Sequence, residues 1–285
     1  MAYLGNPTKT REILERFELT AQKRFGQNFL IDSNILEKIV ASAEITKDDT
    51  VLEIGPGIGT LTQYLCEAAG QVICVEIDKK MIPVLEYTLA DYDNVKVVNN
   101  DVLKVDIGEL IRENGASTVK VVANLPYYIT TPIIMELLEK DIPAESITVM
   151  IQKEVAERMQ VGPGSKDYGA LSLAVSYYCD ANVKMVVSPN CFIPRPNVDS
   201  AVIRLDKLAS PRVSVRNKSE MFRIIKGAFE QRRKTLVNAL SHSSAYSTDK
   251  AKVEKALEEM GKKPGIRGEE LTLEEFAVLS DILTQ

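Results

Sequence analysis

An apolar run passes directly into three alternating glycines at residues 51–59, which read VLEIGPGIG. Gly55, Gly57 and Gly59 have no Cβ, so the backbone can turn here and approach a ligand closely. A dinucleotide fingerprint would place its third glycine at position 60, where this chain has Thr60. The stretch therefore predicts a strand, a ligand-binding turn and a helix, and it favours a nucleotide-type ligand that carries no pyrophosphate.

Strand-like and helical patterns alternate along the first two thirds of the chain. Such alternation predicts right-handed crossovers and a mostly parallel α/β sheet. No obvious helix separates the last two strands, so we expect them to form an antiparallel pair at the sheet edge. The expected strands are 50–54, 71–76, 95–99, 119–123, 146–152, 181–187 and 200–205, and the expected helices are 33–45 (with Ser33 as N-cap), 61–69, 79–91 and 131–139.

Residues after Leu205 follow a different pattern. Ser210 and Pro211 mark a linker, and apolar residues at helical spacing predict one helix over 219–241. Two further helices are expected over 248–260 and 272–284. The chain is therefore expected to fold as a Rossmann-like α/β domain over residues 1–208, followed by a small all-helical domain over residues 209–285.

Composition excludes several classes of protein. No apolar stretch approaches the ~20 residues that a membrane-spanning helix needs. The first 20 residues contain no apolar segment typical of a signal peptide, so we expect a cytoplasmic protein. The four cysteines form no C-x-x-C pair and His242 is the single histidine, so no metal site is expected. Nothing in the sequence indicates an obligate oligomer, and we expect a monomer.

Charge is distributed unevenly along the chain. The formal net charge is −5, which argues weakly against a nucleic-acid partner. Residues 207–240 nevertheless carry nine Lys or Arg and two Glu, a local excess of nine minus two, or +7. Such a segment indicates an anionic partner, and the alternative is an ordinary solvated helix face.

Two acidic residues end successive strands after the glycine turn. Glu76 lies 21 residues after Gly55, near the ~20 expected for a carboxylate that binds ribose hydroxyls. Asp101 ends the next strand, where a carboxylate can accept a hydrogen bond from an adenine amino group. Either acid alone could be a helix cap or a surface charge. Together with the glycine turn they predict an S-adenosylmethionine site, which includes Gly55 and Gly57.

Asn124-Leu125-Pro126-Tyr127 follows the fourth expected strand and suits a methyl acceptor site. The exocyclic nitrogen of adenine is a poor nucleophile, because its lone pair is conjugated into the ring. Two acceptors on its N–H groups would aim that lone pair at the methyl group. Asn124 offers an amide oxygen, and Pro126 forces Leu125 out of the helical region, which leaves the Leu125 carbonyl as the second acceptor. Tyr127 offers a ring for stacking.

A proline-braced segment, residues 192–196, carries one more aromatic ring. Phe192 is predicted to form the other wall of a base pocket, since a flipped base is commonly held between aromatic or apolar side chains. The alternative is a core phenylalanine. No strong base is required, so catalysis would consist mostly of positioning the acceptor for in-line transfer.

Several longer motifs together resemble the ribosomal RNA small-subunit adenine N6,N6-dimethyltransferase family, of the KsgA type. The resemblance covers nearly the whole chain, and several motifs are specific to this family. Besides the glycine turn and Asn124–Tyr127, the motifs are Lys23–Leu30, Gln152–Arg158, Pro163–Gly169, Phe192–Val202 and Gln231–Leu240.

The resemblance implies a seven-stranded methyltransferase fold with a small helical C-terminal domain. It implies transfer of methyl groups from S-adenosylmethionine to two adjacent adenosines near the 3′ end of 16S ribosomal RNA, within a nearly assembled small ribosomal subunit. By position it implies that the cofactor site includes Asn28, Leu30, Gly55, Glu76, Asp101 and Asn124. Asn100 is a departure, since relatives often have glycine there.

The same resemblance assigns an RNA-facing role to basic residues. Lys166 lies in a Pro-Gly-Ser-Lys stretch that lacks the spacing of a phosphate-binding loop for nucleoside triphosphates. A loop that contacts RNA is the expected role. The residues expected to contact RNA are Arg158, Lys166, Arg223, Arg232, Arg233 and Lys234.

Three alternative functions are open on the sequence. The nearest is a 23S ribosomal RNA adenine-N6 methyltransferase of the macrolide-resistance type, which would share the glycine turn and the Asn124–Tyr127 motif. The motifs at 198–202 and 231–236 favour the 16S substrate. A nucleic-acid-binding factor without catalysis is disfavoured by the intact cofactor and acceptor motifs. A dehydrogenase is disfavoured by Thr60 and by the lack of a catalytic histidine.

Overall fold

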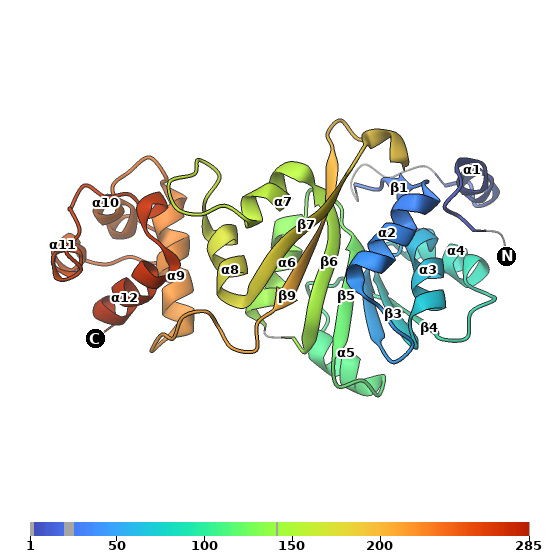
Figure 1. Ribbon diagram of the computed structural model, residues 1–285, viewed down its shortest axis with the longest axis horizontal. Coiled ribbons are helices and arrows are strands. Elements are labelled where there is room, and N and C mark those ends of the chain that lie inside the picture. The colour runs from blue at the N-terminus through green and yellow to red at the C-terminus, as the bar shows by residue number, and fades with distance from the viewer. Residues whose placement is uncertain (1–2, 20–25, 141, 285) are drawn as a thin grey trace. The chain divides into compact units, whose positions relative to one another are not determined.

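The computed structural model describes residues 3–19, 26–140 and 142–284 (Figure 1). The chain divides into two compact units, the first comprising Met1–Ala156 and Ala181–Lys207 and the second Glu157–Asp180 and Leu208–Gln285. The second unit thus includes a segment that lies before the expected boundary at residue 208. Tyr168 explains this, because its hydroxyl donates to the Leu271 carbonyl at 3.0 Å and its ring contacts Phe229.

A seven-stranded sheet forms the centre of the first unit, in the order β4-β3-β2-β5-β6-β9-β7. Strands β2 to β6 are parallel, β9 runs antiparallel to β6, and β7 lies beyond β9 at the edge. All seven expected strands are confirmed. Their bounds are β2 (Thr50–Ile54), β3 (Gln71–Glu76), β4 (Val95–Asn99), β5 (Val119–Asn124), β6 (Ala144–Gln152), β7 (Cys179–Val187) and β9 (Ser200–Lys207).

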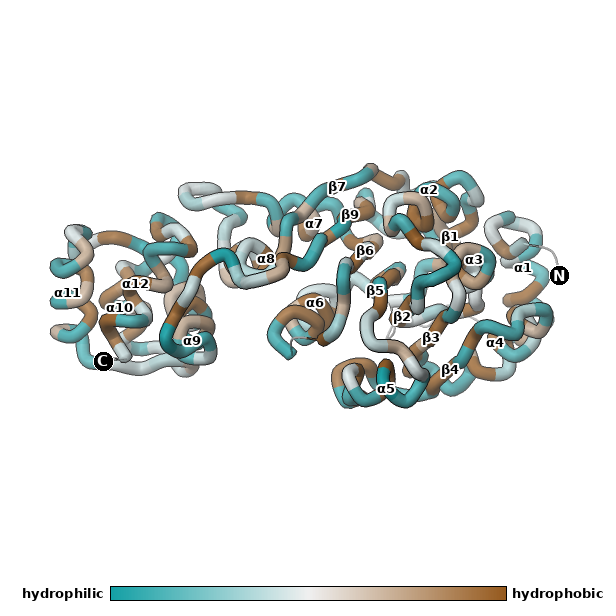
Figure 2. Tube along the Cα trace, turned by 60° about the horizontal axis from the view of Figure 1, so that its bottom comes forward, coloured by the Kyte–Doolittle hydropathy of each residue, from teal (hydrophilic) through white to brown (hydrophobic). Residues whose placement is uncertain are grey.

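Helices connect these strands and cover both faces of the sheet (Figures 1 and 2). Helices α2 and α3 lie on one face, and α5 and α6 on the other. The expected helix at 79–91 is shorter, because a 3₁₀ turn, η2 (Lys79–Met81), precedes α4. The helices of this unit are α1 (Pro7–Arg16), α2 (Ser33–Ala43), α3 (Thr60–Ala68), α4 (Ile82–Thr88), α5 (Ile107–Glu113) and α6 (Thr130–Glu139).

Several elements were not predicted, among them the helices α1 and α5, two short strands and a 3₁₀ turn, and one cap was predicted wrongly. Strands β1 (Phe29–Leu30) and β8 (Phe192–Ile193) pair antiparallel, and the 3₁₀ turn η3 (Pro189–Cys191) precedes β8. The N-cap of α2 is Asp32 and not Ser33, since the Asp32 carboxylate accepts from the amides of the second and third residues that follow it.

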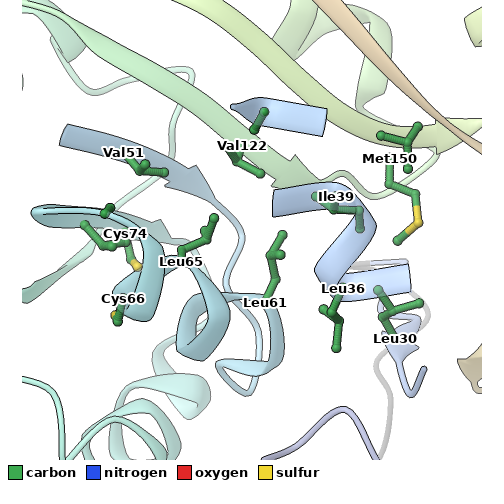
Figure 3. Close-up of a cluster of buried hydrophobic side chains, with 14 of the residues drawn as sticks. Leu30, Leu36, Ile39, Val51, Leu61, Leu65, Cys66, Cys74, Val122 and Met150 are labelled. Carbon is green, nitrogen blue, oxygen red and sulfur yellow. The ribbon is translucent and has the colours of Figure 1, made fainter. Parts of the chain in front are cut away.

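Apolar side chains of α2 and α3 pack on one face of the strands (Figure 3). Leu36 and Ile39 of α2 and Leu65 of α3 are fully buried against Val51 and Val122. Burial of a side chain of this size contributes about 1.5–3 kcal/mol. The adjacent strand residues are buried on the opposite face, which agrees with the largely hydrophobic colour of the central strands in Figure 2.

The second unit is helical. It contains α8 (Ala170–Tyr178), α9 (Lys218–Glu230), α10 (Leu236–Ser241), α11 (Lys250–Glu259), the 3₁₀ turn η4 (Gly268–Glu270) and α12 (Leu273–Leu283), and α7 (Lys153–Met159) spans the unit boundary. The helix predicted over 219–241 is wrong, because it divides into α9 and α10. The Thr235 hydroxyl caps α10, and the Leu236 amide donates to the Ile266 carbonyl at 2.8 Å instead of continuing α9. No helix among the described residues is long and apolar enough to cross a membrane.

Candidate functional site

The glycine turn connects β2 to α3 at the carboxyl end of the sheet. Gly55, Gly57 and Gly59 have φ angles of 68°, 59° and 88°, a region that side-chain-bearing residues rarely adopt. A Cβ at Gly59 would lie 2.9 Å from the Thr88 hydroxyl, whereas a Cβ at Gly55 would meet no protein atom within 4 Å. The turn therefore packs tightly on its helix side and is open at Gly55, as a ligand cradle requires.

Glu76 fixes the conformation of this turn. Its carboxylate accepts from the Gly57 amide at 3.0 Å and from the Asp78 amide at 2.8 Å. The side chain is buried, and burial raises its pKa. Each carboxylate oxygen has a second lone pair, so Glu76 can accept further hydrogen bonds from a ligand while it holds Gly57.

An open cavity lies over the turn. Four of the residues predicted for the cofactor, Gly55, Gly57, Glu76 and Asp101, line it together with Pro126 of the acceptor motif. The other lining residues are mainly apolar, which suits a planar base held by a few polar groups. They are Gln27, Ile54, Val75, Ile77, Asn100, Val102, Tyr128, Ile129 and Ile133.

Asp101 stands at the rim of this cavity, just after β4. One of its oxygens accepts from the Leu103 amide at 3.1 Å, and the other lies 3.8 Å from the ammonium of Lys104. The Asn99 side chain donates to the Glu76 carbonyl at 2.7 Å and ties the ends of β3 and β4 together. The two acids predicted from strand ends are thus brought to one cavity.

The Asn124 side chain has a defined orientation. Its Nδ2 donates to the Asn28 carbonyl at 3.2 Å, and a carbonyl can only accept, so the amide cannot be flipped. Its Oδ1 has no hydrogen-bond partner among the residues that the structure describes. The Leu125 amide donates to the Met150 carbonyl at 3.0 Å and anchors the motif to β6.

The two tyrosines that follow Pro126 differ in exposure and contacts. The Tyr127 hydroxyl forms a 2.7 Å hydrogen bond with Ser200 Oγ at the start of β9, and the ring is half-buried. Tyr128 is 56% exposed and lines the cavity. Sequence reasoning missed Tyr128, whose only signal was its position directly after the motif.

Phe192 and Leu30 are core residues in this structure. They pair across the small sheet of β1 and β8, and each is about 3% exposed. Phe192 does not line the cavity, so the structure matches the alternative of a core phenylalanine more closely than an open pocket wall. Asn28 contributes its carbonyl to Asn124. The beginning of the 23–30 motif, residues 23–25, lies outside the described residues.

The basic residues predicted to contact RNA all belong to the second unit. Arg232 forms a 2.8 Å ion pair with Glu269 and donates to the Ser165 carbonyl, so it organises the 162–169 loop. Arg223 pairs with Glu220 at 2.6 Å. Arg223, Arg233, Lys234 and Lys166 are exposed, and Arg158 is half-buried.

Glu53 was quoted only as part of the glycine-turn spacing, yet it is the most perturbed acid near the site. It lies in β2 and is 1% exposed, and the thiol of Cys74 lies 3.5 Å from its carboxylate. Burial raises its pKa from 4.5 to about 7. The folded protein therefore binds a proton at Glu53 that the unfolded chain releases above pH 4.5.

Stability is expected to fall as pH rises through this window. An acid whose pKa is higher in the folded state contributes fully to the free energy of unfolding below its unfolded pKa. That contribution is lost as the pH rises from the unfolded pKa to the folded pKa. We expect the unfolding free energy of the native chain to fall by about 2 kcal/mol more than that of Glu53→Gln between pH 5 and pH 8. Urea titrations of both proteins at each pH measure this, and parallel pH profiles would contradict it.

No group of three or more His, Cys, Asp or Glu side chains within residues 3–19, 26–140 and 142–284 could hold a metal ion.

The candidate site consists of a glycine turn, two strand-end acids, an oriented amide and a cavity with apolar walls. Gly55 faces open space where a ligand can approach the backbone.

The sheet and this cavity are typical of an S-adenosylmethionine-dependent methyltransferase, because the cavity lies outside the carboxyl ends of β2, β3 and β4, where such folds bind their ligands. The structure superposes on a dimethyladenosine transferase from Plasmodium falciparum with a TM-score of 0.72, at 28% identity over 88% of this chain and 95% of that chain. It superposes on the 23S rRNA methyltransferase ErmE with a TM-score of 0.66, at 27% identity over 90% of this chain and 100% of that chain.

The chain belongs to the ribosomal RNA adenine dimethylase family, whose model matches residues 18–276. The ribosomal RNA small subunit methyltransferase A of Lachnoclostridium phytofermentans is 60% identical to it, over 100% of this chain and 99% of the relative. The protein of the same name from Alkaliphilus metalliredigens is 53% identical over 98% of each chain. The expected fold class, methyltransferase activity and methyl donor are thereby confirmed.

Proposed function

We propose that this protein transfers methyl groups from S-adenosylmethionine to the N6 atoms of two adjacent adenosines near the 3′ end of 16S ribosomal RNA, and so acts in ribosome biogenesis. The observation that carries the proposal is the orientation of Asn124. Its Nδ2 is engaged by the Asn28 carbonyl, so its Oδ1 is the end of the amide that is available to an adenine amino group.

Two acceptors are proposed to hold the adenine amine. Asn124 Oδ1 and the Leu125 carbonyl would each accept one of its N–H groups, which favours a pyramidal nitrogen with its lone pair directed at the methyl group. Pro126 keeps Leu125 non-helical, and the bond from the Leu125 amide to Met150 fixes that peptide. Positioning of this kind can supply up to about 7–11 kcal/mol of the barrier.

The cavity over the glycine turn is the proposed cofactor site, and S-adenosylmethionine supplies an electrophilic methyl group when bound there. Glu76 and Asp101 line the cavity at the ends of neighbouring strands, as ribose and adenine acceptors require. Ile77 and Val102 provide apolar walls for a base. Asn28 orients Asn124, and Leu30 supports the site from the core.

The aromatic rings have separate proposed roles. Tyr127 is proposed to stack on the target adenine, with its ring held by the bond to Ser200. Phe192 would reach the base only after a local rearrangement of β8, since it is buried in the core. We propose a catalytic domain over residues 1–208 and a helical domain over residues 209–285. Glu157–Asp180 is the exception, because this segment packs with the helical domain.

The alternative substrate, 23S ribosomal RNA, is favoured less. Relatives 53–60% identical over the full chain carry the small-subunit name, whereas the 23S enzyme is 27% identical. Methyl transfer to purified small and large subunits from cells that lack this enzyme tests the two directly. We expect incorporation into small subunits, with N6,N6-dimethyladenosine as the product by mass spectrometry. Incorporation into large subunits alone would support the alternative.

The helical unit is proposed to bind the RNA through its exposed basic side chains. Replacing both Arg233 and Lys234 with Glu is expected to weaken binding to small subunits about tenfold or more, since each lost phosphate contact also removes counterion release. Arg232 is a poor target, because it holds Glu269 and a glutamate there would create a like-charge contact. Filter binding at two salt concentrations measures the change, with cofactor affinity as the control. An unchanged affinity and salt slope would show that these two residues are only solvated surface.

The partner and location follow from the substrate. We propose that the protein binds the small ribosomal subunit in the cytoplasm as a monomer. The RNA contacts proposed in the second unit are Arg158, Lys166, Arg223, Arg233 and Lys234, with Arg232 organising the loop that carries Lys166. Sedimentation of the protein alone tests the monomeric state, and sedimentation with small subunits tests the proposed partner.

A further inference from the structure

A chain of buried hydrogen bonds connects the N-terminal segment to the glycine turn. The Thr88 hydroxyl, at the end of α4, donates to the Ile58 carbonyl inside the turn at 2.9 Å. The Gln63 side chain, in α3, donates to the Thr88 carbonyl at 3.0 Å and accepts from the Leu4 amide at 3.0 Å. The Thr10 hydroxyl in α1 donates to the Leu4 carbonyl at 2.8 Å.

The three polar side chains that form this series of hydrogen bonds are almost completely buried. Thr88 and Thr10 are 0% exposed and Gln63 is 1% exposed. Both ends of the Gln63 amide are engaged by backbone groups of fixed polarity, so its orientation is defined. A buried donor or acceptor left without a partner costs about 1–3 kcal/mol, so these bonds hold their positions firmly.

Apolar packing follows the same route. Ile58 of the turn is fully buried in a cluster with Leu4 and Ile13 of the N-terminal segment and Leu85 of α4. Figures 1 and 2 both show α1 beside α3 and α4. The N-terminal segment therefore contacts the turn through packing as well as through hydrogen bonds.

Thr88 also limits how the turn can move. A Cβ at Gly59 would lie 2.9 Å from the Thr88 hydroxyl and 3.3 Å from Leu85, so the α4 side of the turn is in close contact. On its other side the turn is held by Glu76, which accepts from the Gly57 amide. The residue between these two glycines, Ile58, is held only from the α4 side by a side-chain hydrogen bond among the described residues.

We infer that Thr88 and Gln63 are positioning residues for the cofactor, and that the N-terminal segment at residues 4–10 completes this support. They act through the Ile58 carbonyl, which sets the path of the glycine turn, and they do not line the cavity themselves. The inference rests on the proposed placement of S-adenosylmethionine over that turn.

The test compares two opposite changes at Thr88. Thr88→Val keeps the volume and removes the hydroxyl, whereas Thr88→Ser keeps the hydroxyl and removes a methyl group. We expect Thr88→Val to weaken binding of S-adenosylhomocysteine about tenfold in calorimetric titrations, and Thr88→Ser to leave it near the native value. Thr10→Val, at the outer end of the chain of bonds, should weaken binding by a smaller factor of about two to three.

Thr148→Val is the matched control. Thr148 lies in β6, is equally buried and has no hydrogen-bond partner, so the change should leave cofactor affinity as it is. Urea titrations of each variant separate positioning from stability. If affinity falls in proportion to stability in both Thr88 variants, or if Thr88→Val binds as the native chain does, the inference is overturned. If the native chain itself binds no cofactor, the proposed function fails with it.

Discussion

Replacing Asn124 with alanine is expected to lower kcat for methyl transfer about 100- to 1,000-fold, the range seen when one preorganised polar group is removed from an active site. The change removes Oδ1, which is the proposed acceptor for one adenine N–H, and leaves the Leu125 carbonyl alone to orient the amine. It also removes the 3.2 Å bond from Nδ2 to Asn28, so a modest loss of cofactor affinity is expected as well. Single-turnover assays with small subunits, and separate calorimetry, measure the two effects.

Asn114→Ala is the control for this experiment. Asn114 is half-buried and its Nδ2 donates to the Leu110 carbonyl at 2.7 Å, so the lost contact is similar. It precedes β5, at the opposite end of the strand from Asn124. We expect this variant to lose some stability and to retain native turnover. Near-native turnover of Asn124→Ala would contradict the acceptor role.

Gly55→Ala is expected to weaken cofactor binding about 10- to 100-fold, which corresponds to the 1–3 kcal/mol typical of an overpacked site. A Cβ at this position meets no protein atom within 4 Å, so the folded protein has room for it. Gly55 lines the cavity, and the added methyl group would occupy space proposed for the ligand. Calorimetric titration with S-adenosylhomocysteine measures the loss.

Gly115→Ala separates this effect from backbone strain. Gly115 has a φ of 78°, close to the 68° of Gly55, and a Cβ there also meets nothing within 4 Å. Both variants should lose about 1–2 kcal/mol of stability, because a side chain is unfavourable in the left-handed region. Only Gly55→Ala should lose cofactor affinity. Equal affinities in the two variants would place the ligand elsewhere than over Gly55.

The strands and the cofactor acids were predictable because they depend on local patterns. An apolar run followed by glycines predicts a strand and a turn, and parallel strands bring their carboxyl ends to one edge. Glu76 and Asp101 therefore meet at the same cavity, although they are 25 positions apart in the chain. The prediction needed only the strand order that alternation implies.

Other features depend on contacts that sequence spacing does not encode. Apolar spacing at 219–241 fits one helix, and only the capping by Thr235 and the bond from Leu236 to Ile266 divide it. Nothing in the spacing assigns Phe192 to the core, because its burial results from the pairing of β8 with β1.

Sequence patterns also did not predict which residues support the glycine turn. Thr88 and Gln63 look like ordinary helix residues, and each acquires its role from one backbone carbonyl that is distant in sequence. Tyr128 likewise lines the cavity because of the turn that follows Pro126. Fixed hydrogen bonds between elements thus decide the details of a site whose outline the sequence patterns predict.

A crystal structure of the protein with S-adenosylhomocysteine and an RNA strand that contains the paired adenosines would test the central claim most directly. The distances to measure run from the adenine N6 to Asn124 Oδ1 and to the Leu125 carbonyl oxygen. We expect both distances to be about 2.7–3.2 Å. The sulfur of the cofactor should lie on the side of the amine that makes no hydrogen bond to either oxygen. An adenine whose N6 hydrogen-bonds to neither oxygen would contradict the account.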